Sequence, residues 1–269
     1  MTANPPAATG WSDAELAHNP HANADKAAKV RGMFSAIAPS YDLNNRVHSL
    51  WRDQAWRRAA IRAANVKPGE RVLDVACGTG DLTELFANTP ASHVVGGDFT
   101  PAMLDVARAR LASLSEARRA KVTYTDADAT ALAFPDQSFD VVSIAFGLRN
   151  VTDPAKAIRE FVRVLKPGGR LVILEFERPR FFLARWFYDF YCGSIMPRTA
   201  TLISGDRSGA YRYLPRSVGT FLSREQLLDL MRDSGLSRTS GNGLTMGICV
   251  CYRGEKPPAD SDSRAVPRL

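Results

Sequence analysis

A glycine-rich turn is the segment whose residue types point most directly to ligand binding. The turn reads Asp74-Val-Ala-Cys-Gly78-Thr-Gly80 and follows a short apolar run that predicts a buried strand. Glycines at a strand-to-helix turn let the backbone approach a ligand closely, and the helix that follows offers free N–H groups. We therefore expect Asp74, Gly78 and Gly80 to lie in a nucleotide-binding turn.

A second acidic residue, Asp98, lies 20 residues after Gly78, at the end of the next predicted strand. A carboxylate in this place can accept hydrogen bonds from two ribose hydroxyls. A dinucleotide site would require a third glycine where this chain has Thr83. Asp74 would also repel a diphosphate, whereas it would attract the ammonium or sulfonium of S-adenosylmethionine (SAM). The residues therefore favour SAM over a dinucleotide.

The adenine end of the predicted site follows the third strand. Asp126-Ala-Asp128-Ala129 stands there, and an aspartate can accept a hydrogen bond from the exocyclic amine of adenine. Phe99 and Met103 are expected to cover the apolar face of the ring. The alternative is a generic nucleotide-binding turn whose acidic residues only cap helices, as Asp81 could.

Arg149 and Asn150 follow the fourth predicted strand and are the candidates for catalysis. Sites in open α/β sheets lie at the carboxyl ends of the strands, so both residues should face the methyl donor. A guanidinium keeps its charge, and therefore suits an oxyanion better than it suits proton abstraction. Alternatively, Arg149 could pair with Asp153 or with the helix start, and Asn150 could cap that helix.

Tyr41 and Asp42 precede the glycine turn, in a segment that could fold over the cofactor. Tyr41 could donate a hydrogen bond to a ligand oxygen and Asp42 could accept a proton, although such a pair more often fixes a turn. His48 and His93 could titrate near neutrality, but a surface or core role is commoner for a lone histidine.

Alternating strands and helices must position these residues. Apolar runs predict strands at 71–76, 93–97, 121–124, 139–146 and 170–176, with helical patterns between them. Continuous apolar strands separated by helices are typical of a parallel sheet covered on both faces. A strand pair within 236–252 closes the domain. The expected fold is α/β, a class I SAM-dependent methyltransferase with a Rossmann-like, mostly parallel seven-stranded sheet.

The rest of the chain is divided by composition. Residues 1–24 and 257–269 predict disordered tails, because they are polar or rich in proline and lack periodicity. Residues 25–66 are expected to form a helical arm and residues 67–256 the methyltransferase domain. An aromatic-rich insertion interrupts that domain at about 177–222. It is either a lid and apolar channel that touches a membrane, or a dimer contact or satellite core.

Composition and charge restrict the partners. No apolar run approaches the roughly 20 residues of a transmembrane helix, and the N-terminus does not resemble a secretory signal. The four cysteines lack zinc spacing, so no metal is expected, and they suit a reducing cytoplasm. The net charge of +7 allows an anionic membrane or nucleic acid. We expect no nucleic acid, because the basic residues form no stripe interleaved with aromatic residues.

Several segments resemble one family, the C-methyltransferases of quinone biosynthesis that act on demethylmenaquinol or the corresponding polyprenyl benzoquinol. The resemblance extends over about residues 26–254. The glycine turn and Lys166-Pro-Gly-Gly169 are shared with many SAM methyltransferases. The narrower matches are Phe146-Gly-Leu-Arg-Asn-Val151, Leu202-Ile-Ser-Gly-Asp206 and Tyr213-Leu-Pro-Arg-Ser-Val218.

The resemblance implies SAM contacts at Thr79, Asp98, Asp128 and Ala129. Two positions depart from it. Ala145 stands where some members have a serine that contacts SAM, and Arg198-Thr-Ala-Thr201 stands where relatives often have a glycine. With the first departure, this hydrogen bond is either missing or made by the backbone. The second puts details of the lid in doubt but leaves the cofactor assignment unchanged.

The resemblance also implies a function. The chain is expected to methylate a ring carbon of a reduced prenylated quinone precursor, demethylmenaquinol before the benzoquinol, in the cytoplasm or at the inner face of the cell membrane. A homodimer is possible. Two other functions stay open: methylation of another small phenol or lipid, and a non-catalytic SAM-binding subunit of a quinone-synthesis complex.

Overall fold

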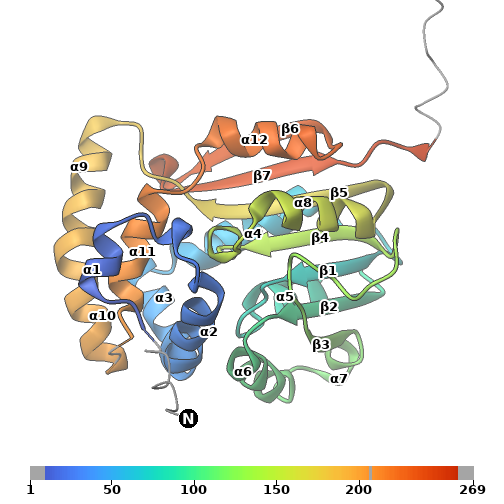
Figure 1. The fold of residues 1–269 in the computed structure, drawn as a ribbon. Helices are drawn as coiled ribbons and strands as arrows, with labels where there is room; N and C mark the ends of the chain where they lie inside the picture. The colour runs from blue at the N-terminus through green and yellow to red at the C-terminus, as the bar shows by residue number, and fades with distance from the viewer. Residues whose placement is uncertain (1–9, 206–207, 260–269) are drawn as a thin grey trace, which may run out of the picture.

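Seven strands form one sheet in the order β3-β2-β1-β4-β5-β7-β6 (Figure 1). Neighbouring strands from β3 to β5 pair in parallel, whereas β7 pairs antiparallel with both β5 and β6. The computed structural model describes residues 10–205 and 208–259. The predicted α/β fold with a mostly parallel sheet is confirmed. The strands are β1 (Arg71–Val75), β2 (His93–Asp98), β3 (Val122–Asp126), β4 (Phe139–Ala145), β5 (Leu165–Phe176), β6 (Ser237–Leu244) and β7 (Cys249–Glu255).

Helices cover both faces of the sheet, which is why the central strands are apolar along their whole length. Alternate residues of a strand point to opposite faces, so Leu73 packs in one core and Val72 in the other. The first core contains residues of α8 (Pro154–Val164) and α12 (Arg224–Asp233), and the second contains residues of α4 (Arg52–Ala64) and α5 (Asp81–Ala87). Near the β3 edge, α6 (Pro101–Leu111) packs on β2 and β3, and α7 (Glu116–Arg119) packs on α5.

The arm and the insertion fold together at one end of the sheet (Figure 1). The arm contains α2 (Lys26–Ile37), the short 3-10 helix η2 (Ala38–Ser40), α3 (Tyr41–Ser49) and α4. The insertion is helical, with α9 (Phe182–Phe190), the π-helical turn η4 (Tyr191–Ile195), α10 (Met196–Ser204) and α11 (Ala210–Gly219). A third core joins them, because Val30 and Met33 of α2 pack with Ala200 and Tyr213 of the insertion.

Residues 10–24, which composition predicts to be disordered, are folded. Ser12 caps α1 (Asp13–Ala17) through a capping box with Glu15, and η1 (Pro20–Ala22) follows. Trp11 is only 3% exposed and stacks on Tyr213, with ring centroids 4.8 Å apart. The prediction was wrong here because local composition does not reveal a distant aromatic partner. Residues 1–9, and residues 260–269 of the other predicted tail, lie outside the described residues.

The last strands also differ from their predicted bounds. β5 begins at Leu165, which pairs with Phe139, although Lys166-Pro-Gly-Gly169 predicts a turn before a strand at 170. The turn residues are present, with Gly168 at a φ of +76°, but β5 continues across them. Two further short 3-10 helices are η3 (Leu148–Asn150), between β4 and α8, and η5 (Thr245–Gly247), between β6 and β7. Within 10–205 and 208–259, no helix is long and apolar enough to cross a bilayer.

Candidate active site

A cavity opens at the carboxyl ends of β1, β2 and β4, and we call it the cofactor cavity. It encloses about 850 Å³ of empty space, part of it open to solvent. Helix α2 and Tyr41 of the arm form its outer wall. Of the predicted site residues, it brings together Gly78, Asp98, Asp128, Ala129 and Asn150.

The glycine turn has the backbone conformation that its sequence predicts. Gly78 has a φ of +57° and Gly80 a φ of +89°, both in the left-handed region that glycine tolerates best. A Cβ on Gly80 would lie 2.3 Å from the hydroxyl of Tyr124, so a larger residue would clash. Gly80 is also the N-cap of α5, and the turn therefore directs the start of that helix toward the cofactor cavity.

Asp98 is held rigidly beside the glycine turn. Its Oδ2 accepts a hydrogen bond from the Gly78 N–H at 2.8 Å, and its Oδ1 accepts one from the Thr100 N–H at 2.8 Å. Burial raises the pKa of Asp98, while the two backbone donors oppose the rise. A carboxylate oxygen can accept a second hydrogen bond. The anchored carboxylate therefore fits a pair of ribose hydroxyls.

Asp128 and Ala129 follow β3 and line the far end of the cofactor cavity. Asp128 accepts hydrogen bonds from the Thr130 N–H at 2.7 Å and the Thr130 hydroxyl at 2.8 Å, both through Oδ1. These bonds orient the side chain and leave Oδ2 for a donor in the cavity. Phe99 and Met103 line the same end, as a cover for an adenine ring requires.

Asp74 and Thr79 lie in a smaller cavity of about 300 Å³ next to the first, which we call the side cavity. Asp74 accepts hydrogen bonds from the hydroxyls of Thr83, at 2.7 Å, and Ser143, at 2.8 Å. Burial raises the pKa of Asp74 to about 6. The Thr79 hydroxyl donates to Asp42 at 2.6 Å. Both residues therefore line the side cavity next to the cofactor cavity, but not the cofactor cavity itself.

A third cavity, of about 630 Å³, lies between the arm, the insertion and the ends of β4 and β5. We call it the acceptor cavity. Phe34, Tyr41 and Phe146 line both this cavity and the cofactor cavity, so the two adjoin. Its wall is aromatic: the rings of Phe146 and Phe176 stack with centroids 4.5 Å apart, and Trp56 packs edge-on against both. Such a cavity suits a flat apolar ring.

Arg149 lies in the wall of the acceptor cavity and is 5% exposed. Its Nη1 donates to Oε1 of Glu175 at 2.7 Å and to the Phe146 carbonyl at 2.6 Å. Its Nε is buried and has no hydrogen-bond partner among the described residues. The alternative pairing with Asp153 is wrong, because Asp153 instead caps α8 through the Lys156 N–H.

Glu175 is a functional candidate that the sequence reading missed. It is a buried carboxylate in the apolar strand β5, and a lone acidic residue in such a run was the available signal. The sequence predicted Asn150 as a candidate but not its link to the insertion. It accepts a hydrogen bond from the Tyr213 hydroxyl at 3.1 Å and donates to the Phe146 carbonyl at 3.2 Å, so it links the insertion to the end of β4.

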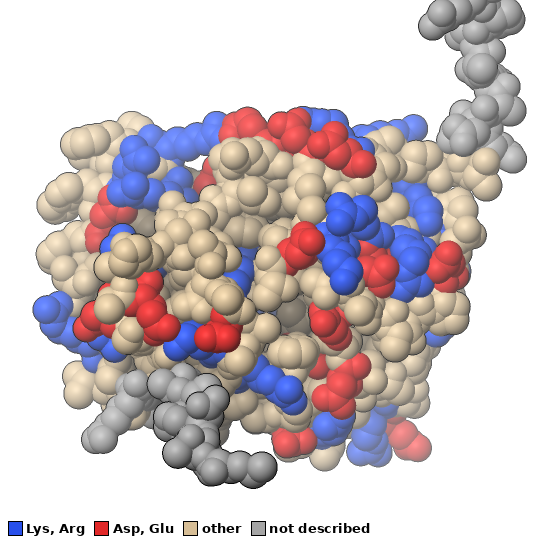
Figure 2. All heavy atoms as spheres, viewed as in Figure 1, with Lys and Arg blue, Asp and Glu red and all other residues tan. Residues whose placement is uncertain are grey.

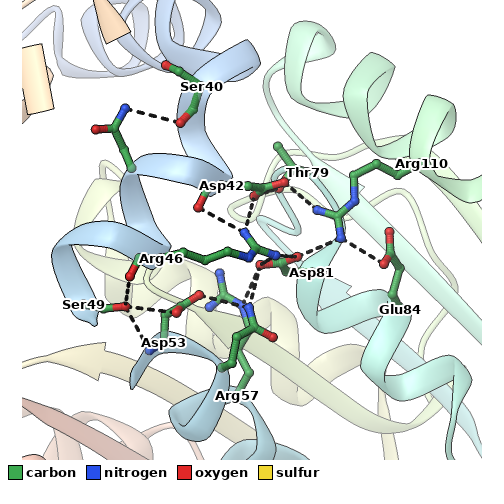
Figure 3. A network of polar contacts seen from close by, with 12 residues as sticks. Ser40, Asp42, Arg46, Ser49, Asp53, Arg57, Thr79, Asp81, Glu84 and Arg110 are labelled. Atoms are coloured by element: carbon green, nitrogen blue, oxygen red, sulfur yellow. Dashed lines mark hydrogen bonds and ion pairs between the residues drawn. The ribbon is translucent and has the colours of Figure 1, made fainter. Parts of the chain in front are cut away.

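A network of ion pairs fastens the arm over the glycine turn (Figure 3). Asp81 is the centre of the network and pairs with Arg46, Arg57 and Arg110, so its role exceeds that of a first-turn acid. Asp42 pairs with Arg110 at 2.6 Å and accepts from Thr79. Asp42 is therefore a connector between α3, α6 and the glycine turn, and it lines none of the three cavities.

Two lone histidines lie away from the cavities. His48 contacts the Tyr191 hydroxyl at 3.1 Å, and burial lowers the pKa of its ring. His93 contacts Thr123 at 3.0 Å on the surface of the sheet. Neither lines the cofactor, acceptor or side cavity, which agrees with a structural role.

Comparison with known families gives one extensive match. The model of the ubiE/COQ5 methyltransferase family matches residues 22–256. The ubiquinone/menaquinone biosynthesis C-methyltransferase UbiE of Ectopseudomonas mendocina is 45% identical over 234 residues, which are 86% of this chain and 90% of that protein. The demethylmenaquinone methyltransferase of Deinococcus radiodurans is 45% identical over 233 residues, 86% of this chain and 94% of that protein.

Solved structures share the fold at much lower identity. A SAM-dependent methyltransferase of Thermotoga maritima, described as a possible histamine N-methyltransferase, covers 84% of this chain and 99% of its own, with a TM-score of 0.59 and 21% identity. Phosphoethanolamine N-methyltransferase 2 of Haemonchus contortus, in complex with SAM, covers 75% of this chain and 52% of its own, with a TM-score of 0.56 and 18% identity. These likenesses establish the fold alone.

Proposed function

Because the chain belongs to the ubiE/COQ5 methyltransferase family, we propose that it methylates a ring carbon of a reduced, prenylated quinone precursor. The chain is a SAM-dependent C-methyltransferase. The acceptor that we propose first is demethylmenaquinol, with the polyprenyl benzoquinol as a second acceptor of the same cavity. The observation that supports this most is the aromatic acceptor cavity, which adjoins the cofactor cavity at Tyr41 and Phe146.

The cofactor cavity and the side cavity fit SAM. We assign the ribose hydroxyls to Asp98 and the adenine to Asp128 and Ala129, while Gly78 and Gly80 allow the backbone to approach. Asp74 and Thr79 would then face the amino-acid end of the cofactor, on the other side of Gly78. When bound, SAM supplies an electrophilic methyl group on a sulfonium.

Arg149 is the residue that we assign to the developing negative charge. As the acceptor hydroxyl loses its proton, negative charge spreads over the oxygen and the neighbouring ring carbon. That carbon would form the new bond to the methyl group as the methyl–sulfur bond breaks. The ring carbon would then release its hydrogen as a proton while the oxygen takes up a proton again, so that one proton is released overall. A preorganised donor aimed at such an oxygen lowers the barrier. The unpaired Nε of Arg149 is such a donor, and Glu175 holds the guanidinium in place.

Tyr41 and Asn150 would orient the acceptor. Burial raises the pKa of Tyr41, so its hydroxyl stays protonated at neutral pH and acts as a hydrogen-bond donor. Tyr41 lines all three cavities and therefore lies where donor and acceptor would meet. Asn150 is fixed by Tyr213, which ties the geometry of the acceptor cavity to the insertion.

We also propose that the protein contacts the inner face of the cell membrane, from the cytoplasm. A prenylated acceptor partitions into the bilayer. Helix α9 lies at the edge of the molecule (Figure 1) and has a stripe of exposed apolar side chains. The stripe consists of Phe182, Leu183, Trp186, Phe187 and Phe190. The same stripe could instead be buried in a homodimer.

Nucleic acid is not among the proposed partners. Figure 2 shows basic and acidic side chains intermixed over the visible face, with no continuous basic surface. Many of the arginines are paired, as Arg163 is with Asp136 and Glu160. Basic side chains without acidic partners bind the phosphates of a nucleic acid and displace the counterions of those phosphates. Arginines that are paired with carboxylates are less available for this binding.

A methyl-transfer assay tests the function. The protein is incubated with SAM labelled in its methyl group and with reduced demethylmenaquinone, the reduced benzoquinone precursor or an unrelated small phenol. We expect labelled C-methyl product from the naphthoquinol and less from the benzoquinol. Labelling of the small phenol alone would show a different acceptor class. SAM binding without labelling of any acceptor would support a non-catalytic subunit.

A further inference from the structure

Arg57 is a buried cation whose charge is only partly compensated. It lies on α4 and is 5% exposed. Its nearest acidic contact is 3.6 Å from Nε to Asp81, too long for a hydrogen bond. Its Nε and Nη1 are buried without a hydrogen-bond partner among the described residues. Unpaired buried donors on a charged group cost free energy, so this arrangement suggests a ligand that completes it.

Arg57 lines the side cavity opposite Asp74, and these two residues give the cavity one group of each charge. Burial raises the pKa of Asp74 to about 6, and the charge of Arg57 opposes that rise. Among the described residues, the side chain of Asp74 accepts hydrogen bonds only from two neutral hydroxyls, those of Thr83 and Ser143. A small ligand with both an ammonium and a carboxylate would therefore satisfy both residues.

The side cavity is also in the right place for such a ligand. It shares Tyr41, Ala76, Gly78 and Ala145 with the cofactor cavity. With the adenine assigned to Asp128 and the ribose to Asp98, the side cavity, which meets the cofactor cavity at Gly78, is where the rest of SAM would extend. The part of SAM beyond its ribose is an amino acid, which has an ammonium and a carboxylate on one carbon.

We propose that Arg57 binds the α-carboxylate of SAM, as Asp74 binds its ammonium, and that Arg57 thereby selects a cofactor with an intact amino-acid end. This inference rests on the assignment of SAM to these cavities. A guanidinium can donate two parallel hydrogen bonds to a carboxylate. Arg57 already lines the side cavity, and its Nε and Nη1 have no hydrogen-bond partner among the described residues.

Arg57 also lines the acceptor cavity, and this is the competing role. In that role the donors of Arg57 would bind an oxygen of the acceptor ring, which is the role proposed above for Arg149. The carboxylate of SAM is favoured as the ligand of Arg57 because Asp74, in the same side cavity, can bind the ammonium of the same amino-acid group. The acceptor cavity already has Arg149, whose Nε is free for a ring oxygen.

Calorimetry with two ligands tests the proposal. Decarboxylated SAM keeps the adenine, ribose, sulfonium and amine but lacks the carboxylate. We expect wild type to bind SAM about 30-fold more tightly than decarboxylated SAM, the magnitude of a charge-assisted hydrogen bond. Arg57→Gln should weaken SAM binding by about 30-fold and decarboxylated SAM binding by less than about threefold. The preference should thus vanish in the variant.

Arg46→Gln is the matched control. Arg46 also pairs with Asp81, at 3.0 Å, but it lines none of the three cavities. Its loss should change the affinities for both ligands by the same factor and leave the preference intact. Arg57→Lys keeps the charge without the planar fork and should give an intermediate preference. Thermal unfolding confirms that each variant is folded.

Three outcomes would overturn the proposal. Wild type that binds both ligands equally would overturn it without any variant. Arg57→Gln that weakens both ligands equally would show a structural role. Arg57→Gln that leaves both affinities unchanged but raises the KM for the acceptor would place Arg57 in the acceptor site. If wild type bound neither ligand, the cofactor assignment itself would be wrong, which is a distinguishable result.

Discussion

Arg149 lines the acceptor cavity, its Nε has no hydrogen-bond partner among the described residues, and its contacts with Glu175 and Phe146 fix its position. Removing the whole side chain would leave Glu175 buried without its partner, which costs about 3–5 kcal/mol of stability. Arg149→Lys is therefore the sharper variant, because the ammonium can still pair with Glu175 while the Nε donor is lost.

The expected result for Arg149→Lys is a turnover about 100-fold lower, since one donor to a developing oxyanion contributes a factor of roughly 10²–10³. The affinity for SAM should stay within about threefold, because Arg149 does not line the cofactor cavity. Stopped assays at saturating acceptor, with calorimetry of SAM, measure both. Arg149→Ala is the harsher test. Turnover equal to wild type in a folded variant of either kind would remove Arg149 from the mechanism.

Asp74 makes the stability of the ligand-free protein depend on pH. Burial raises its pKa from 3.8 to about 6. The folded state therefore binds the proton more tightly than the unfolded state. The stabilisation is fully present below pH 4 and is lost as the pH rises through about 6. A shift of this size corresponds to about 3 kcal/mol.

Asp74→Asn should remove this pH dependence. We expect the free energy of unfolding of wild type, without SAM, to fall by about 2–3 kcal/mol more than that of the variant between pH 4 and pH 7. Urea unfolding at several pH values measures it. Asp128→Asn, a change at an exposed carboxylate, is the control and should follow wild type. Parallel curves for wild type and Asp74→Asn would contradict the prediction.

At the scale of elements, α9 is the helix whose sequence and environment disagree most. A helix of a soluble protein normally buries its apolar side, but the stripe of α9 faces outward, with Phe182 74% exposed and Trp186 62% exposed. Asp189, near the end of the helix, pairs with Arg178, which precedes the helix. Such a helix is suited to lie in the interface of a bilayer.

Trp186→Ser combined with Phe187→Ser should lower binding to anionic vesicles by at least about tenfold, because each exposed ring buries apolar area in the interface. The melting temperature should not fall, since both side chains are exposed. Flotation at low and high salt measures binding, and the net charge of +7 predicts weaker binding at high salt. Unchanged flotation together with a halved molecular mass would show that the stripe is a dimer contact instead.

The arm and the insertion form a second layer over the site, and α3 is its most strongly fastened element. Three arginines from three helices, Arg46, Arg57 and Arg110, meet at Asp81. The network joins α3, α4 and α6 to the helix that follows the glycine turn (Figure 3). Ion pairs in a partly buried network hold orientation more than they add stability, and here they hold Tyr41 over the cofactor cavity.

At the scale of the whole molecule, the N-terminal segment is coupled to the active site. Trp11 stacks on Tyr213, and the Tyr213 hydroxyl bonds to Asn150. The Trp11 N–H also donates to the Ser208 carbonyl at 2.8 Å, and Asp13 pairs with Arg212. The first described residues thus support the insertion, which supports the acceptor cavity.

Trp11→Ala should lower the free energy of unfolding by about 3 kcal/mol, as expected when a buried aromatic ring is removed. The KM for the acceptor should rise more than the dissociation constant of SAM, because Tyr213 lines the acceptor cavity and not the cofactor cavity. Denaturant unfolding and steady-state kinetics measure the two effects, with the exposed Arg118→Ala as control. Equal changes for both ligands would contradict the coupling.

Local patterns in the chain were enough for the sheet and for the cofactor end of the site. The strands of an α/β sheet are continuous apolar runs, and the glycine turn, Asp98 and Asp128 follow directly after their strands. The carboxyl ends of parallel strands meet at one edge, so residues in these positions must come together. This geometry follows from sequence order alone, which is why these residues could be named in advance.

The residues around the acceptor cavity could be assigned only from the tertiary structure. Arg57 could not be recognised beforehand, and Glu175 stood out only as an acidic residue in an apolar strand, because the roles proposed for them depend on partners from other elements or on the lack of one. The same holds for Asp42, which pairs with Arg110, and for Trp11, which packs 202 positions before Tyr213. Burial and pairing of charge depend on contacts between distant segments, and a linear pattern records only neighbours along the chain.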